Sequence, residues 1–262
     1  MKAATVFLGR MTTLEVERFV KEHTHVLIPT GSTEQHGPHG PLLTDAIIAE
    51  EVAGRVAERI GAVVAPRINY ALSYPHVGFT GLVHVRIATF MGLVEDLCDQ
   101  LARIGFRRIV FLNGHYDNTY AIAYACATAA PRLPAGTQAY PVNYWDGMTP
   151  EQAAEFFDPA NGLHANRGET SALLAIDPAL VDMEMANAEM PPFPDVANAE
   201  AVHTAFFFSN PGSIRRATRS GTWGDARGSD AGFGRRYLEV VTESTIRLLA
   251  DIERTFEAMP AR

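Results

Sequence analysis

The stretch VLIPTG, residues 26–31, predicts a buried strand that ends at a turn. Its apolar run has the length of a strand, and Thr30-Gly31 closes it. Thr44 follows as the expected N-cap of a helix, and apolar residues recur behind it at helical spacing up to Gly61. A strand, a polar loop and a helix therefore make the first unit of the predicted fold.

The same alternation continues to about residue 145. Further strands are predicted at 62–65, 107–112 and 137–143, and helices at 90–104 and 118–130. This β-α-β-α-β-α-β order favours an α/β fold, a three-layer sandwich with a mostly parallel central sheet and helices on its faces. In such sheets, functional residues gather in the loops at the carboxyl ends of the strands.

The pattern loosens in the second half of the chain. Helices are predicted at 167–176 and 232–258, and the segment 186–229 between them is rich in Pro, Asn and Gly. A structureless stretch of that length is unusual inside a compact domain, so we expect it to be a cover or a subunit contact. Residues 1–262 are expected to form one domain.

The composition excludes several classes of protein. The formal net charge is -8, and no basic cluster is long enough for a general nucleic-acid surface. The apolar, charge-free stretch at residues 118–131 is too short for a membrane span, which needs about 20 apolar residues. Cys98 and Cys126 are expected to be buried thiols in a reducing compartment, and the N-terminus lacks the apolar core of a secretory signal. We therefore do not expect a secreted protein.

A carboxylate and an imidazole follow the first predicted strand. Glu34 and His36 are two residues apart, so an extended backbone directs both side chains the same way. Asp45 lies where the helix begins, and its carboxylate can face back into the loop. This donor set suits a divalent metal such as zinc or manganese. The alternative is structural, with Asp45 satisfying the helix start and His36 or His39 packed against loop backbone.

A second pair follows the strand at 107–112. His115 and Asp117 repeat the imidazole and carboxylate at the same two-residue spacing. Both pairs would lie at strand ends of one parallel sheet, which supplies about five ligands together with Asp45. Five ligands are enough for two adjacent metals that share a carboxylate, and Asp45 would be the natural bridge.

A third cluster lies near residue 164. His164 precedes a predicted helix whose first turn contains Glu169, and these two are the candidate catalytic residues. Alone, Glu169 would be a favourable charge at a helix N-terminus and His164 a surface imidazole. Beside two metal half-sites, His164 becomes a candidate proton shuttle. No phosphate-binding glycine motif and no serine-hydrolase elbow is present.

These clusters together resemble the creatininase (creatinine amidohydrolase) family. Residues 29–37 with Asp45 are similar to the family's first metal motif, residues 113–118 to its second, and His164 with residues 169–171 to its third. The three motifs occur in order and span most of the chain. The resemblance implies a creatininase-like fold with a homo-oligomeric, often hexameric, assembly in the cytoplasm.

The resemblance also implies a ligand set for two divalent metal ions, zinc or manganese or both. Glu34 and His115 would hold one ion, His36 and Asp117 the other, and Asp45 would bridge them. The family's creatininases have Glu where this chain has Asp117. The shorter side chain could change the second ion site, or Glu169 could be recruited to it.

The resemblance further implies that Tyr116, Trp145 and His164 lie near a small cyclic substrate. Residues 161–163, before His164, lack the Trp and acidic residues with which creatininases hold theirs. The metal centre is therefore better supported than the identity of the substrate.

The expected function is a metal-dependent amidohydrolase of a cyclic amide or related small polar ring, creatinine-like. A metal-bridged hydroxide would attack the carbonyl, and His164 would protonate the leaving nitrogen. The same family chemistry also admits hydrolysis of the formamide of a pyrimidine intermediate, or ring opening of an oxidised cyclic polyol. A catalytically inert metal-binding sensor is the alternative from another class, but an inert site has little need of a positioned acid–base group such as His164.

Overall fold

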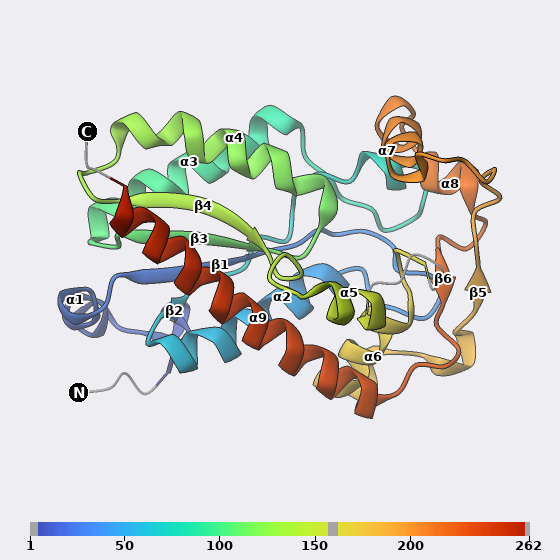
Figure 1. Ribbon diagram of the computed structural model, residues 1–262, viewed down its shortest axis with the longest axis horizontal. Coiled ribbons are helices and arrows are strands. Elements are labelled where there is room, and N and C mark those ends of the chain that lie inside the picture. The colour runs from blue at the N-terminus through green and yellow to red at the C-terminus, as the bar shows by residue number, and fades with distance from the viewer. Residues whose placement is uncertain (1–4, 157–161, 260–262) are drawn as a thin grey trace.

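A four-stranded parallel sheet forms the centre of the protein (Figure 1). The computed structural model describes residues 5–156 and 162–259. The strands of this sheet, in the spatial order β2-β1-β3-β4, are β1 (His25–Thr30), β2 (Val63–Val64), β3 (Arg108–Asn113) and β4 (Gln138–Asn143). Each neighbouring pair is parallel, which confirms the predicted α/β architecture.

Side chains of the central strands alternate between two cores. In β1, Val26 and Ile28 enter one apolar cluster and Leu27 enters the other. In β3, Phe111 belongs to the first cluster and Val110 to the second. Because both faces of the sheet are covered, both sets of positions are apolar, which explains the continuous apolar runs of the sequence.

Helices on the two faces complete the three layers (Figure 1). The face that holds Phe111 is covered by α1 (Thr13–Glu22), α3 (Ile87–Ile104) and α4 (Thr119–Ala129). The face that holds Val110 is covered by α2 (Thr44–Ile60), α6 (Arg167–Ile176) and α9 (Ala231–Ala258). Cys98 and Cys126 are buried free thiols on the first of these faces.

The other elements are short. They are α5 (Pro150–Phe156), α7 (Ala199–Ser209), α8 (Ser213–Ala217), the strands β5 (Ala188–Glu189) and β6 (Gly224–Asp225), and the 3-10 helices η1 (Leu8–Arg10), η2 (Tyr74–His76), η3 (Tyr116–Asn118), η4 (Ala130–Arg132), η6 (Pro178–Leu180) and η7 (Met183–Met185). Within the described ranges, no helix combines the length and apolar character needed to cross a membrane.

The C-terminal end of α2 agrees with the sequence prediction, but its N-cap does not. Gly61 ends the helix in the left-handed region, with φ of 72°, as a glycine C-cap does. At the other end, the N-cap is Leu43, and Thr44 is the first helical residue. The Thr44 hydroxyl donates back to the carbonyl of Pro41 at 2.7 Å, and the predicted cap was wrong because Thr44 is already helical.

The segment 186–229 is more ordered than its composition predicts. It contains α7 and α8, and its strands β5 and β6 pair with each other in antiparallel fashion. Aromatic packing explains this order, because the ring of Phe207 lies 5.1 Å from Trp223 and Phe193 lies 5.6 Å from the same indole. The backbone of Trp223 also pairs with that of His164, which joins this segment to the third sequence motif.

Candidate metal centre

The loops after β1 and β3 meet at one edge of the sheet, because these strands are parallel neighbours. Each strand is followed by a glycine that has no room for a side chain. A Cβ on Gly31 would lie 2.3 Å from the backbone nitrogen of Ala46, and one on Gly114 would lie 2.7 Å from the carbonyl oxygen of Asp45. The two glycines therefore allow the first turn of α2 to approach both strand ends, which brings Asp45 between the loops.

Asp45 contacts the histidine of each loop with a different oxygen. Its Oδ1 lies 3.0 Å from Nε2 of His36, and its Oδ2 lies 3.1 Å from Nδ1 of His115. The Ser32 hydroxyl donates to Oδ2 at 2.7 Å and fixes the orientation of the carboxylate. All four side chains are buried, so water does not screen these contacts.

Glu34 lies on the His115 side of Asp45. Its Oε2 is 3.5 Å from Nε2 of His115 and accepts a hydrogen bond of 2.6 Å from the Ser73 hydroxyl. The ligand atoms of Glu34, Asp45 and His115 lie within 4.8 Å of one another, a spacing at which they could hold one cation.

Glu169 and Asp117 lie beside different histidines. Glu169 Oε1 is 3.8 Å from Nε2 of His36, whereas Asp117 Oδ2 is 3.8 Å from Nε2 of His115. Among the described residues, His36, Asp45 and Glu169 form a second group whose ligand atoms lie within 4.8 Å. The structure thus brings Glu169 to His36, the place for which the family resemblance implied Asp117.

Several buried polar atoms of this cluster make no well-aligned hydrogen bond, even where a charged partner lies close by. They are His36 Nε2, His115 Nε2, Asp117 Oδ2 and Glu169 Oε2. Unpaired buried polar atoms are costly in free energy, and their concentration at one place needs a physical explanation. Imidazole and carboxylate ligands around bound cations would satisfy these atoms, so the residues present fit a metal centre.

The charges of the histidines in this cluster follow from the carboxylates that face them. Burial by itself lowers the pKa of His36, but the charge and hydrogen bond of Asp45, with Glu169 and Glu34, raise it to about 9. Burial likewise opposes protonation of His115, and the nearby carboxylates raise its pKa to about 10. Burial would raise the pKa of Asp45, yet the two rings hold it well below its usual range.

The surrounding acids are shifted in the opposite direction. Burial, opposed by His115 and reinforced by the charge of Asp45, raises the pKa of Glu34 to about 8. Burial also raises the pKa of Asp117 and of Glu169. This crowding of buried carboxylates favours bound protons or bound cations over free anions.

His164, predicted from the third motif, lies in the same cluster. Its ring centroid is 4.3 Å from that of His36, and its Nδ1 is 3.7 Å from Oε1 of Glu34. Glu34, His36 and His164 form a third group of closely spaced ligand atoms. Burial and then the charge of His36 lower the pKa of His164 well below its usual range, so the ring is neutral at pH 7.

His76, with Ser73 and Gln35, is a part of the site that sequence reasoning missed. The Nε2 of His76 lies 3.5 Å from Glu34 Oε1, and its ring centroid is 4.5 Å from that of His164. Burial, followed by the charges of neighbouring histidines, lowers its pKa well below the usual range. His76 lies in η2, within an irregular stretch that follows no long apolar strand, so the spacing that revealed the other pairs was absent.

Two of the residues expected near a substrate lie at different depths. Tyr116 is 49% exposed, and its ring lies 6.5 Å from that of Phe208 in α7. Trp145 is partly buried and packs edge to face on Tyr144, with 5.0 Å between ring centroids. Of residues 161–163, Asn161 lies outside the described residues.

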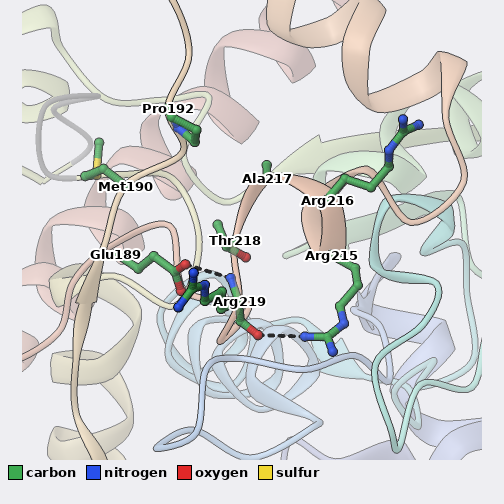
Figure 2. Close-up of a pocket in the computed structure, with 8 residues that line it drawn as sticks. All are labelled: Glu189, Met190, Pro192, Arg215, Arg216, Ala217, Thr218 and Arg219. Carbon is green, nitrogen blue, oxygen red and sulfur yellow. Dashed lines mark hydrogen bonds between the residues drawn. The ribbon is translucent and has the colours of Figure 1, made fainter.

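A pocket of about 570 Å³ lies elsewhere, between β5 and α8 (Figure 2). The Glu189 carboxylate accepts from the backbone N–H of Arg219, and the Arg215 guanidinium donates to the carbonyl of Arg219 (Figure 2). The lining residues include none of the predicted ligands or catalytic residues. This arginine-lined pocket is therefore separate from the histidine and carboxylate cluster.

Comparisons with known proteins agree with the three motifs. The model of the family described as creatininase, creatinine amidohydrolase, matches residues 9–249. The chain is 36% identical over 195 residues to creatinine amidohydrolase of Pseudomonas putida, which covers 69% of this chain and 75% of that protein.

Relatives with other activities are also similar to this chain. A mycofactocin precursor peptide peptidase of Mycolicibacterium smegmatis is 39% identical over 177 residues, which are 65% of this chain and 64% of that protein. A 3-dehydro-scyllo-inosose hydrolase of Thermotoga maritima is 29% identical over 187 residues, which are 69% of this chain and 59% of that protein.

Solved creatininase structures share the fold. A manganese form and a mutant of Zn-Zn type each superpose with a TM-score of 0.80 at 29% identity, covering 94% of this chain and 98% of the other. The family match covers the residues of all three motifs in one chain. The protein therefore belongs to the creatininase family.

Proposed function

We propose that this creatininase-family hydrolase depends on divalent cations and cleaves a C–N bond of a small cyclic amide, as in creatinine. The observation that carries the proposal is the position of Asp45, whose two oxygens separately face His36 and His115 at 3.0 and 3.1 Å. A buried carboxylate that is shared in this way is suited to lie between two cations.

The geometry supports a specific distribution of ligands. Glu34 and His115 would hold one ion, His36 and Glu169 the other, and Asp45 would contribute to both. Zinc and manganese suit these ligands and are the metals of the similar creatininase structures. Bound cations of this kind lower the pKa of a water ligand and polarise a carbonyl oxygen.

His164 is the proposed proton carrier. Because its ring is neutral at pH 7, it can accept a proton from the attacking water and then donate that proton to the leaving nitrogen. Its Nδ1, which faces the Glu34 side of the cluster, is the atom that would carry the proton. Tyr116 and Trp145 are the candidate residues for packing against the substrate ring.

A peptide C–N bond is a second candidate substrate. The 39% identity to a mycofactocin precursor peptide peptidase favours it, since that value is as high as the identity to creatinine amidohydrolase. The 49% exposure of Tyr116 also leaves one side of the cluster open to a longer substrate. Ring opening of an oxidised cyclic polyol is supported by the inosose hydrolase relative alone.

The experiment that tests the proposal compares substrates on one preparation. The purified protein, supplied with Mn²⁺ or Zn²⁺, is assayed for interconversion of creatinine and creatine and for cleavage of a mycofactocin precursor peptide. Creatinine turnover that chelation abolishes and metal restores is the expected result. Cleavage of the peptide alone would favour the second candidate, and metal binding without any turnover would favour an inert sensor. Size-exclusion chromatography with light scattering tests the expected hexamer.

A further inference from the structure

Gln35 lies between the two histidines whose pKa values are low, and its side chain is confined there. The residue is 5% exposed. A Cβ on Gly221, which has φ of 89°, would lie 1.9 Å from Gln35 Oε1. Only glycine at position 221 therefore leaves room for this part of the chain to lie over the side-chain amide of Gln35.

The orientation of the Gln35 amide follows from one contact. The backbone N–H of Gly37 donates to Gln35 Oε1 at 2.9 Å, and because a backbone N–H only donates, the oxygen must face it. The NH₂ group then faces Nδ1 of His76 at 2.9 Å and the carbonyl of Gly221 at 3.2 Å. Its two hydrogens match these two acceptors.

The tautomer of His164 follows from the backbone of the same residue. The Nε2 of His164 lies 2.7 Å from the carbonyl oxygen of Gln35, and a carbonyl only accepts, so Nε2 must carry the hydrogen. The approach of Gln35 Nε2 to the same ring atom, at 3.0 Å, then joins two donors and is not a hydrogen bond. The lone pair of a neutral His164 is left on Nδ1.

We propose that Gln35 is a positioning residue that sets the tautomers of both rings, through its side chain at His76 and through its backbone carbonyl at His164. His76 accepts at Nδ1, so its hydrogen is on Nε2, which lies 3.5 Å from Glu34 Oε1. His164 donates at Nε2, so its lone pair is on Nδ1, which lies 3.7 Å from the same carboxylate oxygen.

The two assignments give the rings different tasks. His76 would orient the Glu34 carboxylate with an N–H, as partners of metal ligands commonly do. His164 would present a basic nitrogen to the reacting groups, which is the state that a proton carrier needs before it acts. Only this last step rests on the proposed hydrolase function. If no amide were hydrolysed, the proposed function would fail but the tautomers would stand.

The first test measures the tautomers directly. Long-range ¹H–¹⁵N correlation spectra of the Zn²⁺-loaded protein at pH 8 distinguish Nδ1–H from Nε2–H rings, and His76→Gln and His164→Asn variants assign the signals. Both rings are expected as Nε2–H tautomers. A hydrogen on Nδ1 of either ring overturns the proposal, and this measurement needs the variants only for assignment.

The second test separates the side chain of Gln35 from its backbone. Gln35→Glu keeps the length of the side chain but replaces the NH₂ donor with an acceptor, so His76 should gain a proton on Nδ1 while His164 keeps its hydrogen on Nε2. The matched control is Gln100→Glu on the exposed side of α3, which should shift neither ring. An unchanged His76 in Gln35→Glu overturns the side-chain role, and loss of the Nε2 hydrogen from His164 overturns the backbone role.

The third test follows the consequence for the metal centre. Gln35→Met removes the donor without adding a charge, and loss of the oriented His76 N–H should weaken Zn²⁺ binding by about 10-fold, at the low end for partners of metal ligands. Competition with a chelator measures the affinity, and Gln100→Met is the control. Equal affinities in the two variants contradict the orienting role of His76.

Discussion

His36 and His115 differ sharply from His76 and His164, although all four rings are buried in one cluster. Their exposed fractions are 1, 6, 5 and 8% respectively. The first two have pKa values raised to about 9 and about 10, and the second two have pKa values well below their usual range. Burial is therefore not what separates the pairs.

The nearest partner of each ring explains why the pKa values of the two pairs differ. Burial alone lowers the pKa of a histidine, and a carboxylate in contact reverses that effect. His36 and His115 each lie about one hydrogen-bond length from Asp45, at 3.0 and 3.1 Å. His164 instead donates to a backbone carbonyl. Contact with Asp45 thus favours the protonated rings of His36 and His115, whereas the surroundings of Gln35 favour neutral rings at His76 and His164.

Asp45→Asn should remove most of the pKa difference between the two pairs of histidines. The amide removes the shared negative charge, so the raised pKa values of His36 and His115 should collapse and both ion sites should be lost. We expect kcat/KM to fall by at least about 10³-fold, since a bound cation contributes several kcal/mol to the transition state. Metal content by mass spectrometry and turnover check this, with exposed Asp96→Asn as the control. Normal metal content in Asp45→Asn would rule out the bridging role.

Glu169→Gln and Asp117→Asn test which of these two acids completes the ion site at His36. Glu169 contacts His36 and Asp117 contacts His115, both at 3.8 Å, so Glu169→Gln should selectively empty the site at His36. We expect about 100-fold weaker binding of the second ion in that variant and about 10-fold in Asp117→Asn, within the range for residues that support a metal site. Calorimetric titration with Zn²⁺ resolves the two steps. The reverse order would return the second site to Asp117.

Ser73→Ala tests how firmly Glu34 is held. The hydroxyl donates to Glu34 Oε2 at 2.6 Å, and a hydrogen bond to a charged group contributes roughly 1.5–3 kcal/mol. Zn²⁺ affinity should fall about 10-fold, the lower part of the range that energy allows. Ser209→Ala, at an exposed helix end, is the control. An affinity equal to that of the control would show that Glu34 keeps its place without Ser73.

The smallest expected effect is a pH dependence of stability. Glu34, His36 and His115 have raised pKa values in the folded protein, so without metal the native state binds more protons than the unfolded state. Their stabilisation is complete below the unfolded pKa values, about 4.3 for Glu and 6.5 for His, and is lost as pH rises through about 8 to 10.

The melting temperature of the chelator-treated protein should therefore decrease by several degrees between pH 7 and pH 10, above the range in which His76 and His164 would titrate in the unfolded chain. With Zn²⁺ the trend should reverse, because the cation replaces the protons on His36 and His115 and binds more tightly as pH rises. Differential scanning calorimetry with and without Zn²⁺ compares the two profiles. Profiles that run in parallel would contradict the assignment of these rings to the metal centre.

The sequence by itself determined the central sheet and most of the side chains that make up the candidate metal centre. Apolar runs at residues 26–29 and 107–112 predicted β1 and β3 because a strand buried on both faces must be apolar throughout. Parallel pairing then places the residues after both strands at one edge, so the pairs Glu34/His36 and His115/Asp117 were predictable from spacing alone.

Only the tertiary structure decided which residues complete the site. Ser73 lies 39 positions from Glu34, and His164 lies 129 positions from Gln35, and neither contact follows from any local pattern. His76 lies in a loop without periodicity, and the helix start of α6 carries Glu169 to His36. Periodicity reports which face of an element is buried, whereas partners of a buried charge are set by how distant loops close over it. The sequence therefore indicated where the candidate metal ligands gather, and the packing of the loops decided which rings stay neutral beside them.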